Sequence, residues 1–292
     1  MRSLGLIGVP TNSNGTREGV ARAPAALRAA GLVERLRSHV EVRDHGDLTL
    51  PDPSPERDAT THLIDPNGLT RLVPTVRDAV RTVLTQGEFP LVIGGDCPLV
   101  LGCLLGARAG ERIGLLFVDG HEDAYLPAQS SSGEAADTEL AFALGLADAS
   151  WSPELAPLLP ILDPDDTYLL GPRDAQTLQG EGVPSLGDRV RLVDGEALLR
   201  DPGPAAAEAC SSLPRPWWFH LDLDVLSTEA FPAIDYPQPG GLDWDGLAEL
   251  TATVLANEPA GWDVTIYNPD LDTDLIHARR VVDFLADAIG AM

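Results

Sequence analysis

The sequence predicts an α/β fold, a three-layer sandwich in which a mainly parallel sheet of eight strands is flanked by helices. Two observations carry this prediction. Short apolar runs bounded by turn residues recur along the 292 residues, and stretches with helical spacing of apolar residues lie between most of them. Hydrophobic residues make up 44% of the chain, so it can bury a large core. We expect one domain over residues 1–292.

The predicted strands are the short apolar runs, taken in chain order. They cover residues 4–9, 40–45, 89–95, 113–119, 167–171, 190–194, 217–224 and 261–267. Helices are predicted where the apolar spacing becomes helical, at 68–87, 98–110 and 241–259. Alternation of strands and helices indicates a mainly parallel sheet, and such sheets bind their ligands beyond the carboxyl ends of the strands.

Composition excludes several classes of function. A formal charge of −25 would repel nucleic acid and anionic membranes, so neither is an expected partner. All 20 basic residues are arginine, which excludes chemistry that depends on lysine. No apolar run approaches the roughly 20 residues of a membrane helix, and we expect a cytoplasmic protein. The three cysteines, Cys97, Cys103 and Cys210, form no CxxC motif and no disulfide framework.

Acidic residues gather where two predicted strands end, in the segments FVDGHEDAY and FHLDLDVL. Residues two apart on a strand point to the same face, so Asp222 and Asp224 should project together. The same spacing joins Asp119 and His121, and Asp123 follows where the chain is expected to turn. Carboxylates that converge in this way repel one another unless cations neutralise them.

This pattern predicts a metal site. A single D-x-D string is usually a strand end that meets solvent, but here two such strings accompany a glycine-glycine-aspartate turn after a third strand. Carboxylate oxygens together with imidazole suit Mn, Zn, Fe, Ni or Co. A pair of metals bridged by shared aspartates would satisfy so many acids.

These motifs resemble those of the ureohydrolase family of arginase, agmatinase and formimidoylglutamase. That family carries G-G-D-H, D-A-H-x-D and x-x-D-x-D at three strand ends, and this sequence reads G-G-D-C at 94–97, D-G-H-E-D at 119–123 and H-L-D-L-D at 220–224. Further similar strings are GVARAPAALRAAGL, DHGDL, LLGPRD, PQPGGL and YNP, so the resemblance covers almost the whole chain.

The resemblance implies an arginase-like fold with a dinuclear metal centre. Its ligands would be Cys97, Asp119, His121, Asp123, Asp222 and Asp224, with Asp119 and Asp222 bridging both ions. A metal-bridging hydroxide would attack a carbon–nitrogen bond of a linear amidine or guanidino compound. Asp123 and His121 are the expected catalytic residues, with Asp123 accepting a hydrogen bond from the nucleophile. The resemblance also implies a small-molecule substrate and a homo-oligomer, either a trimer or a hexamer.

The main departure from the family pattern is Cys97, which stands where the family has a histidine. By resemblance the two divalent ions would be manganese, whereas a softer thiolate ligand would admit Zn, Fe, Co or Ni. Four aspartates and one thiolate would carry a charge of −5, whereas two divalent ions carry +4. The extra negative charge should raise the pKa of the bridging water. Alternatively Cys97 stays protonated as an inert thiol, and a single ion is bound by Asp119, His121, Asp222 and Asp224.

Positions that contact substrate in the family differ as well. Ile266 replaces the glutamate that pairs with a guanidinium group, and Tyr125 replaces an asparagine that binds an α-amino acid. Free L-arginine is therefore not the expected substrate. Glu134 is a candidate for cation recognition, with an ordinary solvated loop acid as its alternative. His220 either lines the site or holds an aspartate in place. The predicted substrate contacts are Glu134, Tyr125, His220 and Ile266.

Three functions remain open from the sequence. The leading one is a metal-dependent hydrolase of a linear amidine or guanidino compound. The second is a single-metal zinc amidase or deacylase on the same fold, suggested by Cys97 and Ile266. The third is a catalytically degenerate family member.

Overall fold

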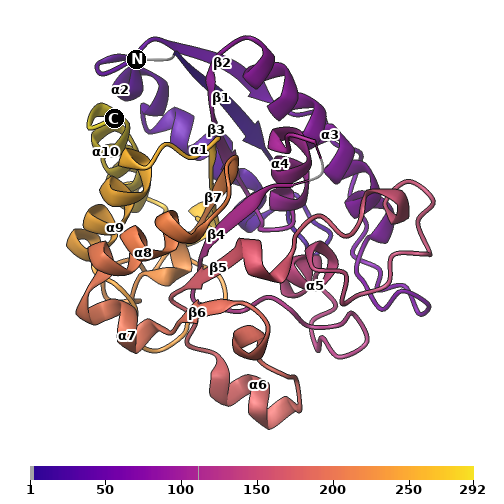
Figure 1. Ribbon diagram of the computed structural model, residues 1–292. Coiled ribbons are helices and arrows are strands. Elements are labelled where there is room, and N and C mark those ends of the chain that lie inside the picture. The colour runs from indigo at the N-terminus through magenta and orange to yellow at the C-terminus, as the bar shows by residue number, and fades with distance from the viewer. Residues whose placement is uncertain (1–2, 111) are drawn as a thin grey trace.

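The computed structural model describes residues 3–110 and 112–292, and within them all eight predicted strands form one sheet (Figure 1). Every pairing is parallel, in the order β2-β1-β3-β8-β7-β4-β5-β6. The predicted fold class is confirmed, and the sheet is parallel throughout. The strands are β1 (Leu4–Val9), β2 (Val42–Asp47), β3 (Phe89–Gly94), β4 (Gly114–Val118), β5 (Thr167–Leu170), β6 (Arg191–Val193), β7 (Trp217–Asp222) and β8 (Trp262–Thr265). The expectation of one domain agrees with this continuous sheet and stays a prediction.

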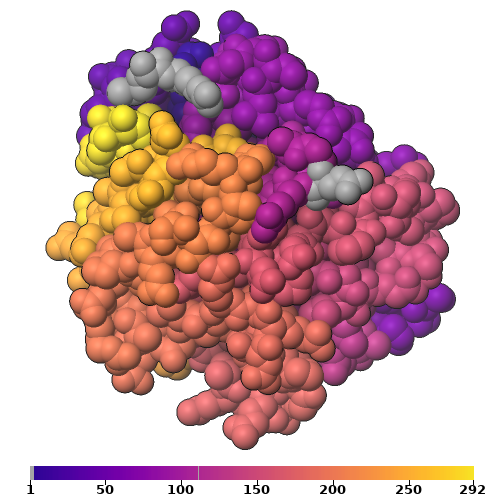
Figure 2. Space-filling view, viewed as in Figure 1, coloured from indigo at the N-terminus to yellow at the C-terminus, as the bar shows by residue number. Residues whose placement is uncertain are grey.

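Helices cover both faces of the sheet, and each face has its own apolar core. In Figure 1, α3, α4 and α5 lie on one side, and α1, α2 and α7 to α10 lie on the other. The helices are α1 (Ala23–Ala29), α2 (Leu32–Arg37), α3 (Pro66–Thr85), α4 (Leu99–Ala107), α5 (Glu139–Ala143), α6 (Ala175–Glu181), α7 (Gly195–Arg200), α8 (Pro202–Ser212), α9 (Trp244–Ala256) and α10 (Ile276–Gly290). Figure 2 shows the yellow C-terminal segment beside indigo N-terminal segments at one edge of the molecule.

Helices α3 and α4 show how the sequence determines the packing on the face of the sheet that they cover. The side chain of Asp65 caps α3 by accepting a hydrogen bond of 3.0 Å from the Gly68 backbone N–H. Every residue of α4 is buried. Gly102 and Gly106 allow the close approach of α3, because a Cβ at either position would lie within 2.9 Å of α3 atoms. A buried α4 fixes the turn that precedes it, which carries Cys97.

The four central strands, β3, β8, β7 and β4, bring the acidic motifs together. Since they run parallel as neighbours, their carboxyl ends meet at one edge of the sheet. At this edge β7 is followed directly by the 3-10 turn η6 (Leu223–Val225). The other short 3-10 turns of the described residues are η1 (Gly19–Arg22), η2 (Ala135–Asp137), η3 (Ala156–Leu158), η4 (Pro164–Asp166), η5 (Leu186–Asp188) and η7 (Pro269–Leu271). In the described part of the chain, no helix combines the length and apolarity needed to cross a bilayer.

Candidate metal centre

A cavity of about 620 Å³ opens at the carboxyl ends of the central strands. It is strongly acidic, and among the described residues that line it there is no arginine. The carboxylates on its wall are Glu18, Asp96, Asp123, Glu134, Asp137, Asp174, Glu181, Asp222, Asp224, Asp235 and Asp270. Such a wall attracts cations and repels anions.

One group of donor atoms consists of Asp119, His121 and Asp224, all within 4.8 Å of one another. His121 Nδ1 lies 2.7 Å from Asp224 Oδ2 and 3.6 Å from Asp119 Oδ1. The strand β7 ends at Asp222, so Asp224 lies in the turn η6 and not on the strand as the spacing predicted. That turn is held because Asp222 Oδ1 accepts the Asp224 N–H at 2.6 Å, while Asp224 Oδ1 accepts the Gly120 N–H at 2.8 Å.

A second donor group consists of Cys97, Asp119 and His220, and it shares Asp119 with the first. The turn after β3 places Cys97 because Gly95 packs directly against the Thr11 carbonyl, where a Cβ would overlap it. The Cys97 thiol donates a hydrogen bond to Asp222 Oδ2 at 3.0 Å and lies 3.2 Å from Thr265 Oγ1. All three members of this group are buried.

The charges at the two groups are not balanced by the protein alone. Burial, followed by the charge of Asp224, raises the pKa of Asp222 well above its usual range. Burial and then the charge of Asp119 do the same to the pKa of Asp123. Burial alone would lower the pKa of His121, but the charges and hydrogen bonds of Asp224 and Asp119 together outweigh it and raise that pKa well above its usual range. Protonation of this kind is what clustered acids require when no cation is present.

Two buried atoms in the second group also have no hydrogen-bond partner among the described residues, Asp119 Oδ2 and His220 Nε2. Buried polar atoms are almost always paired, so an orphaned carboxylate oxygen facing an orphaned ring nitrogen needs an explanation. Carboxylate, imidazole and thiol donors suit divalent transition metals. The donor set therefore fits metal ions.

Of the other predicted ligands, Asp222 contacts Cys97 and Asp224, and Asp123 lies on the cavity wall outside both donor groups. Asp123 has a left-handed backbone, with φ of 43°. The chain turns there, as the sequence predicted, and the Asp123 carboxylate lies on the cavity wall.

Three predicted substrate contacts line the cavity, namely Tyr125, Glu134 and Ile266. The Tyr125 hydroxyl donates to Glu181 at 2.7 Å. Ile266 has φ of 67°, a strained conformation for a β-branched residue. The fourth, His220, is fully buried and is not among the residues that line the cavity, so the first of its two predicted placements is not seen. It lies behind the wall, beside Asp119.

The sequence did not single out several residues of this site. The Tyr236 hydroxyl donates to Glu134 Oε1 at 2.8 Å, and Gln238 Nε2 lies 3.1 Å from His121 Nε2. Both belong to the loop around the PQPGGL string. The similarity of that string to the family was the feature of the sequence that could have identified these two residues. Glu139, which the sequence offered only as one of several acids in the loop around Glu134, is also fully buried, and neither of its carboxylate oxygens has a partner in the described residues. Nothing in its local sequence distinguishes it from a helix-start acid.

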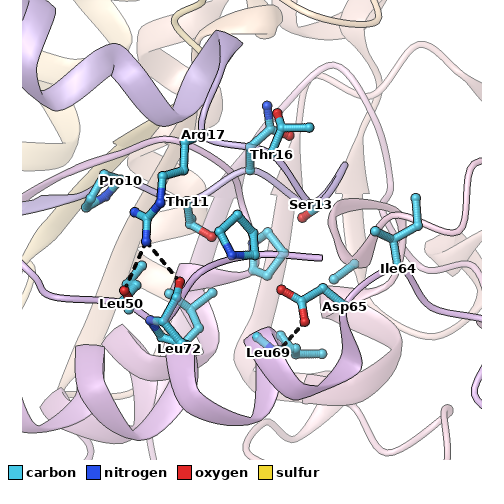
Figure 3. Close-up of a pocket in the computed structure, with 16 residues that line it drawn as sticks. Pro10, Thr11, Ser13, Thr16, Arg17, Leu50, Ile64, Asp65, Leu69 and Leu72 are labelled. Atoms are coloured by element: carbon cyan, nitrogen blue, oxygen red, sulfur yellow. Dashed lines mark hydrogen bonds between the residues drawn. The ribbon is translucent and has the colours of Figure 1, made fainter. Parts of the chain in front are cut away.

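A smaller cavity of about 50 Å³ lies nearby, between the first loop and the start of α3 (Figure 3). Its charged groups are already paired, since Arg17 donates to the Leu50 carbonyl and Asp65 caps α3. A space of this size holds only a few water molecules. Of these two cavities, the one of about 620 Å³ is the candidate active site, because it carries the carboxylates and borders the donor groups.

The protein therefore belongs to the class of α/β proteins that carry metal-donor groups at the carboxyl ends of a parallel sheet. A sequence profile described as the Arginase family matches residues 2–290. The arginase of Brevibacillus brevis is 27% identical over 297 residues, covering 99% of this chain and 98% of that protein. The arginase of Bacillus caldovelox is 30% identical over 255 residues, covering 84% of this chain and 83% of that protein.

Solved structures agree with these matches. The arginase of Bacillus caldovelox superposes with a TM-score of 0.85 at 26% identity, covering 99% of both chains. The proclavaminate amidino hydrolase of Streptomyces clavuligerus has the same fold, with a TM-score of 0.70 at 20% identity over 100% of this chain and 91% of that one. The chain belongs to the Arginase family, whose members are hydrolases that act on carbon–nitrogen bonds. The predicted family resemblance is confirmed.

Proposed function

We propose that this protein is a metal-dependent hydrolase that cleaves a carbon–nitrogen bond of a linear amidine or guanidino compound other than free L-arginine. The observation that carries the substrate class is the cavity wall, which presents eleven carboxylates and, among the described residues, no arginine. A substrate with its own carboxylate would meet repulsion there, whereas a cationic guanidino amine would be attracted. A cytoplasmic location and a trimeric or hexameric assembly stay predictions.

The two donor groups support the metal requirement. Two divalent ions, manganese by family resemblance or Zn, Fe, Co or Ni because of Cys97, would supply an activated water as nucleophile. Asp123 projects from the cavity wall, where its carboxylate would accept a hydrogen bond from that water and pass the proton to the departing nitrogen. His121 lies between Asp224 and Gln238, which orient its ring.

The outer wall would bind the cationic end of the substrate. Glu134 is held by the Tyr236 hydroxyl, and both lie on the cavity wall with Tyr125. Burial, then the charge of Asp96, raises the pKa of Glu134 to about 7, so a bound cation would favour its ionised form. Ile266 offers only an apolar surface and cannot pair with a guanidinium group.

The test compares substrates on one preparation of protein reconstituted with manganese or with zinc. A guanidino amine without a carboxylate should release urea at least about tenfold faster, in kcat/KM, than L-arginine. The chelator-treated protein is the control and should be inactive. A preference for L-arginine would contradict the proposed substrate class, and full activity after verified metal removal would contradict the mechanism.

A second candidate is a single-metal zinc amidase or deacylase. It is favoured by the hydrogen bond from the Cys97 thiol to Asp222, which keeps the sulfur protonated, and by the apolar side chain of Ile266. An N-acylated diamine would suit the same acidic wall. Release of a carboxylic acid from such a compound, with one zinc per chain, would favour this candidate over the first.

A further inference from the structure

His220 is held in one orientation by its surroundings. Its Nδ1 lies 2.6 Å from Asp263 Oδ2, and its ring stacks on Phe117 with centroids 4.4 Å apart. Asp263 is itself fully buried, and its other oxygen accepts a hydrogen bond from Trp218 Nε1. The carboxylate therefore favours a proton on Nδ1, and Nε2 is the ring nitrogen left to bind a metal ion.

The free nitrogen faces the second donor group. His220 Nε2 lies 3.8 Å from Asp119 Oδ2, which is too long for a hydrogen bond, and both atoms lack other partners in the described residues. Cys97 Sγ lies within 4.8 Å of a ring nitrogen of His220 and of a carboxylate oxygen of Asp119. Metal-binding histidines commonly donate their second ring N–H to a carboxylate, and the His220–Asp263 pair has that arrangement.

We propose that His220 is a metal ligand, and that Nε2 of His220, Sγ of Cys97 and a carboxylate oxygen of Asp119 together hold one of the two ions. This inference rests on the metal-dependent part of the proposed function and not on its substrate class. The imidazole that the family resemblance places at position 97 would then come from β7 instead. A sulfur and nitrogen donor set favours zinc or cobalt over manganese.

The competing explanation is structural: His220 would be an imidazolium held between Asp263 and Asp119, with no role in metal binding. The two explanations differ in metal content, because only a ligand changes the number of ions when it is removed. They also differ in the ligands that X-ray absorption would detect around bound zinc. Neither measurement requires a substrate.

The experiment counts zinc per chain after reconstitution and dialysis, by elemental analysis, in the wild type, His220→Ser and His45→Ser. His45 is a matched control, since it also pairs with a buried carboxylate, Glu88, at 2.8 Å, but lies on β2 away from the donor groups. We expect His220→Ser to bind one zinc fewer than the wild type and His45→Ser to bind the same number. Equal zinc in all three would overturn the proposal.

Two further measurements cover the case in which His220→Ser does not fold. In Cys97→His/His220→Ser, the imidazole is returned to the turn after β3, and we expect the lost ion to be restored with an increased preference for manganese. Zinc X-ray absorption of the wild type should show sulfur and, on average, one imidazole per zinc if both His121 and His220 bind. Absence of the second imidazole would overturn the proposal. A wild type that binds no metal would overturn the proposed mechanism with it, whereas inactivity on guanidino compounds would leave this inference intact.

Discussion

The two donor groups share Asp119 but are built differently. In the first, His121 and Asp224 lie on loops beyond β4 and β7, and the His121 side chain is 17% exposed at the cavity. In the second, Cys97 and His220 are 1% and 0% exposed, and the His220 ring is fixed by Phe117 and Asp263. We call the first group open, because His121 is partly exposed, and the second closed, because all of its members are buried. Cys97 of the closed group borders the same cavity from the turn after β3, and His220 lies on strand β7.

This difference separates two roles that a metal site can have. Catalytic metal sites keep a position open to water or substrate, whereas closed sites hold an ion in fixed surroundings. An ion in the open group would meet the substrate, and one in the closed group would act on it through the shared Asp119. Removing the shared residue should therefore affect both groups, and removing a support of one group should affect that group alone.

The largest effect is expected for Asp119→Asn, because this carboxylate belongs to both donor groups. We expect metal affinity to fall by at least about 100-fold, with loss of activity, as measured by zinc content and urea release. Asp78→Asn on the exposed side of α3 is the control and should behave as wild type. Retention of two tightly bound ions in Asp119→Asn would show that the groups do not share a ligand.

A selective effect is expected for Asp263→Asn, which alters only the support of His220. The amide cannot hold the Nδ1 proton as a carboxylate does, so the affinity for one ion should fall by about 10- to 100-fold while the other is unchanged. Competition with a chromophoric chelator would resolve the two affinities. Equal weakening of both ions would contradict the distinction between the closed and open groups.

A pH-dependent effect is expected at Glu134 on the open side. Its pKa of about 7 lies above the ordinary value, so the carboxyl is protonated below neutrality and cannot attract a cation. The KM for a cationic substrate should fall by about tenfold between about pH 6 and about pH 8, and Glu134→Gln should flatten this change. The same raised pKa means that Glu134 destabilises the folded state as pH rises from about 4.5 to about 7. An unchanged pH profile in the variant would place cation recognition elsewhere.

The smallest effect is expected for Ile266→Glu, which introduces a guanidinium partner at the cavity wall. The turnover of small guanidino compounds should rise a few-fold, because the new carboxylate adds one ion pair while the left-handed backbone stays strained. Ile266→Gln is the matched control and should give no gain. If both variants lose activity equally, the apolar side chain itself is required.

The fold could be predicted from sequence because its signals are local. Each strand is a short apolar run, and the observed strand ends differ from the predicted ones by at most two residues; at β7 the hydrogen bonds that Asp222 and Asp224 accept hold Asp224 in a turn. The convergence of the acids could also be predicted, because they follow neighbouring parallel strands whose carboxyl ends meet at one edge of the sheet. The assumption that they alternate along the strands was wrong, since β4 ends before Asp119 and β7 ends before Asp224. The placement of His220 was not, because whether it faces the cavity or the wall behind it depends on Asp263, 43 residues later.

Trp218 donates its indole N–H to the carboxylate that holds His220, so the indole ring is joined to the proposed ligand through a single side chain. An ion bound at Nε2 would draw electron density from the imidazole and along this chain of hydrogen bonds. The fluorescence of Trp218 would then respond to occupancy of the closed group, and cobalt would quench it more strongly than zinc, because zinc is diamagnetic and has no d–d absorption. Binding of a metal ion to the closed group could thus be followed by intrinsic fluorescence, without a label.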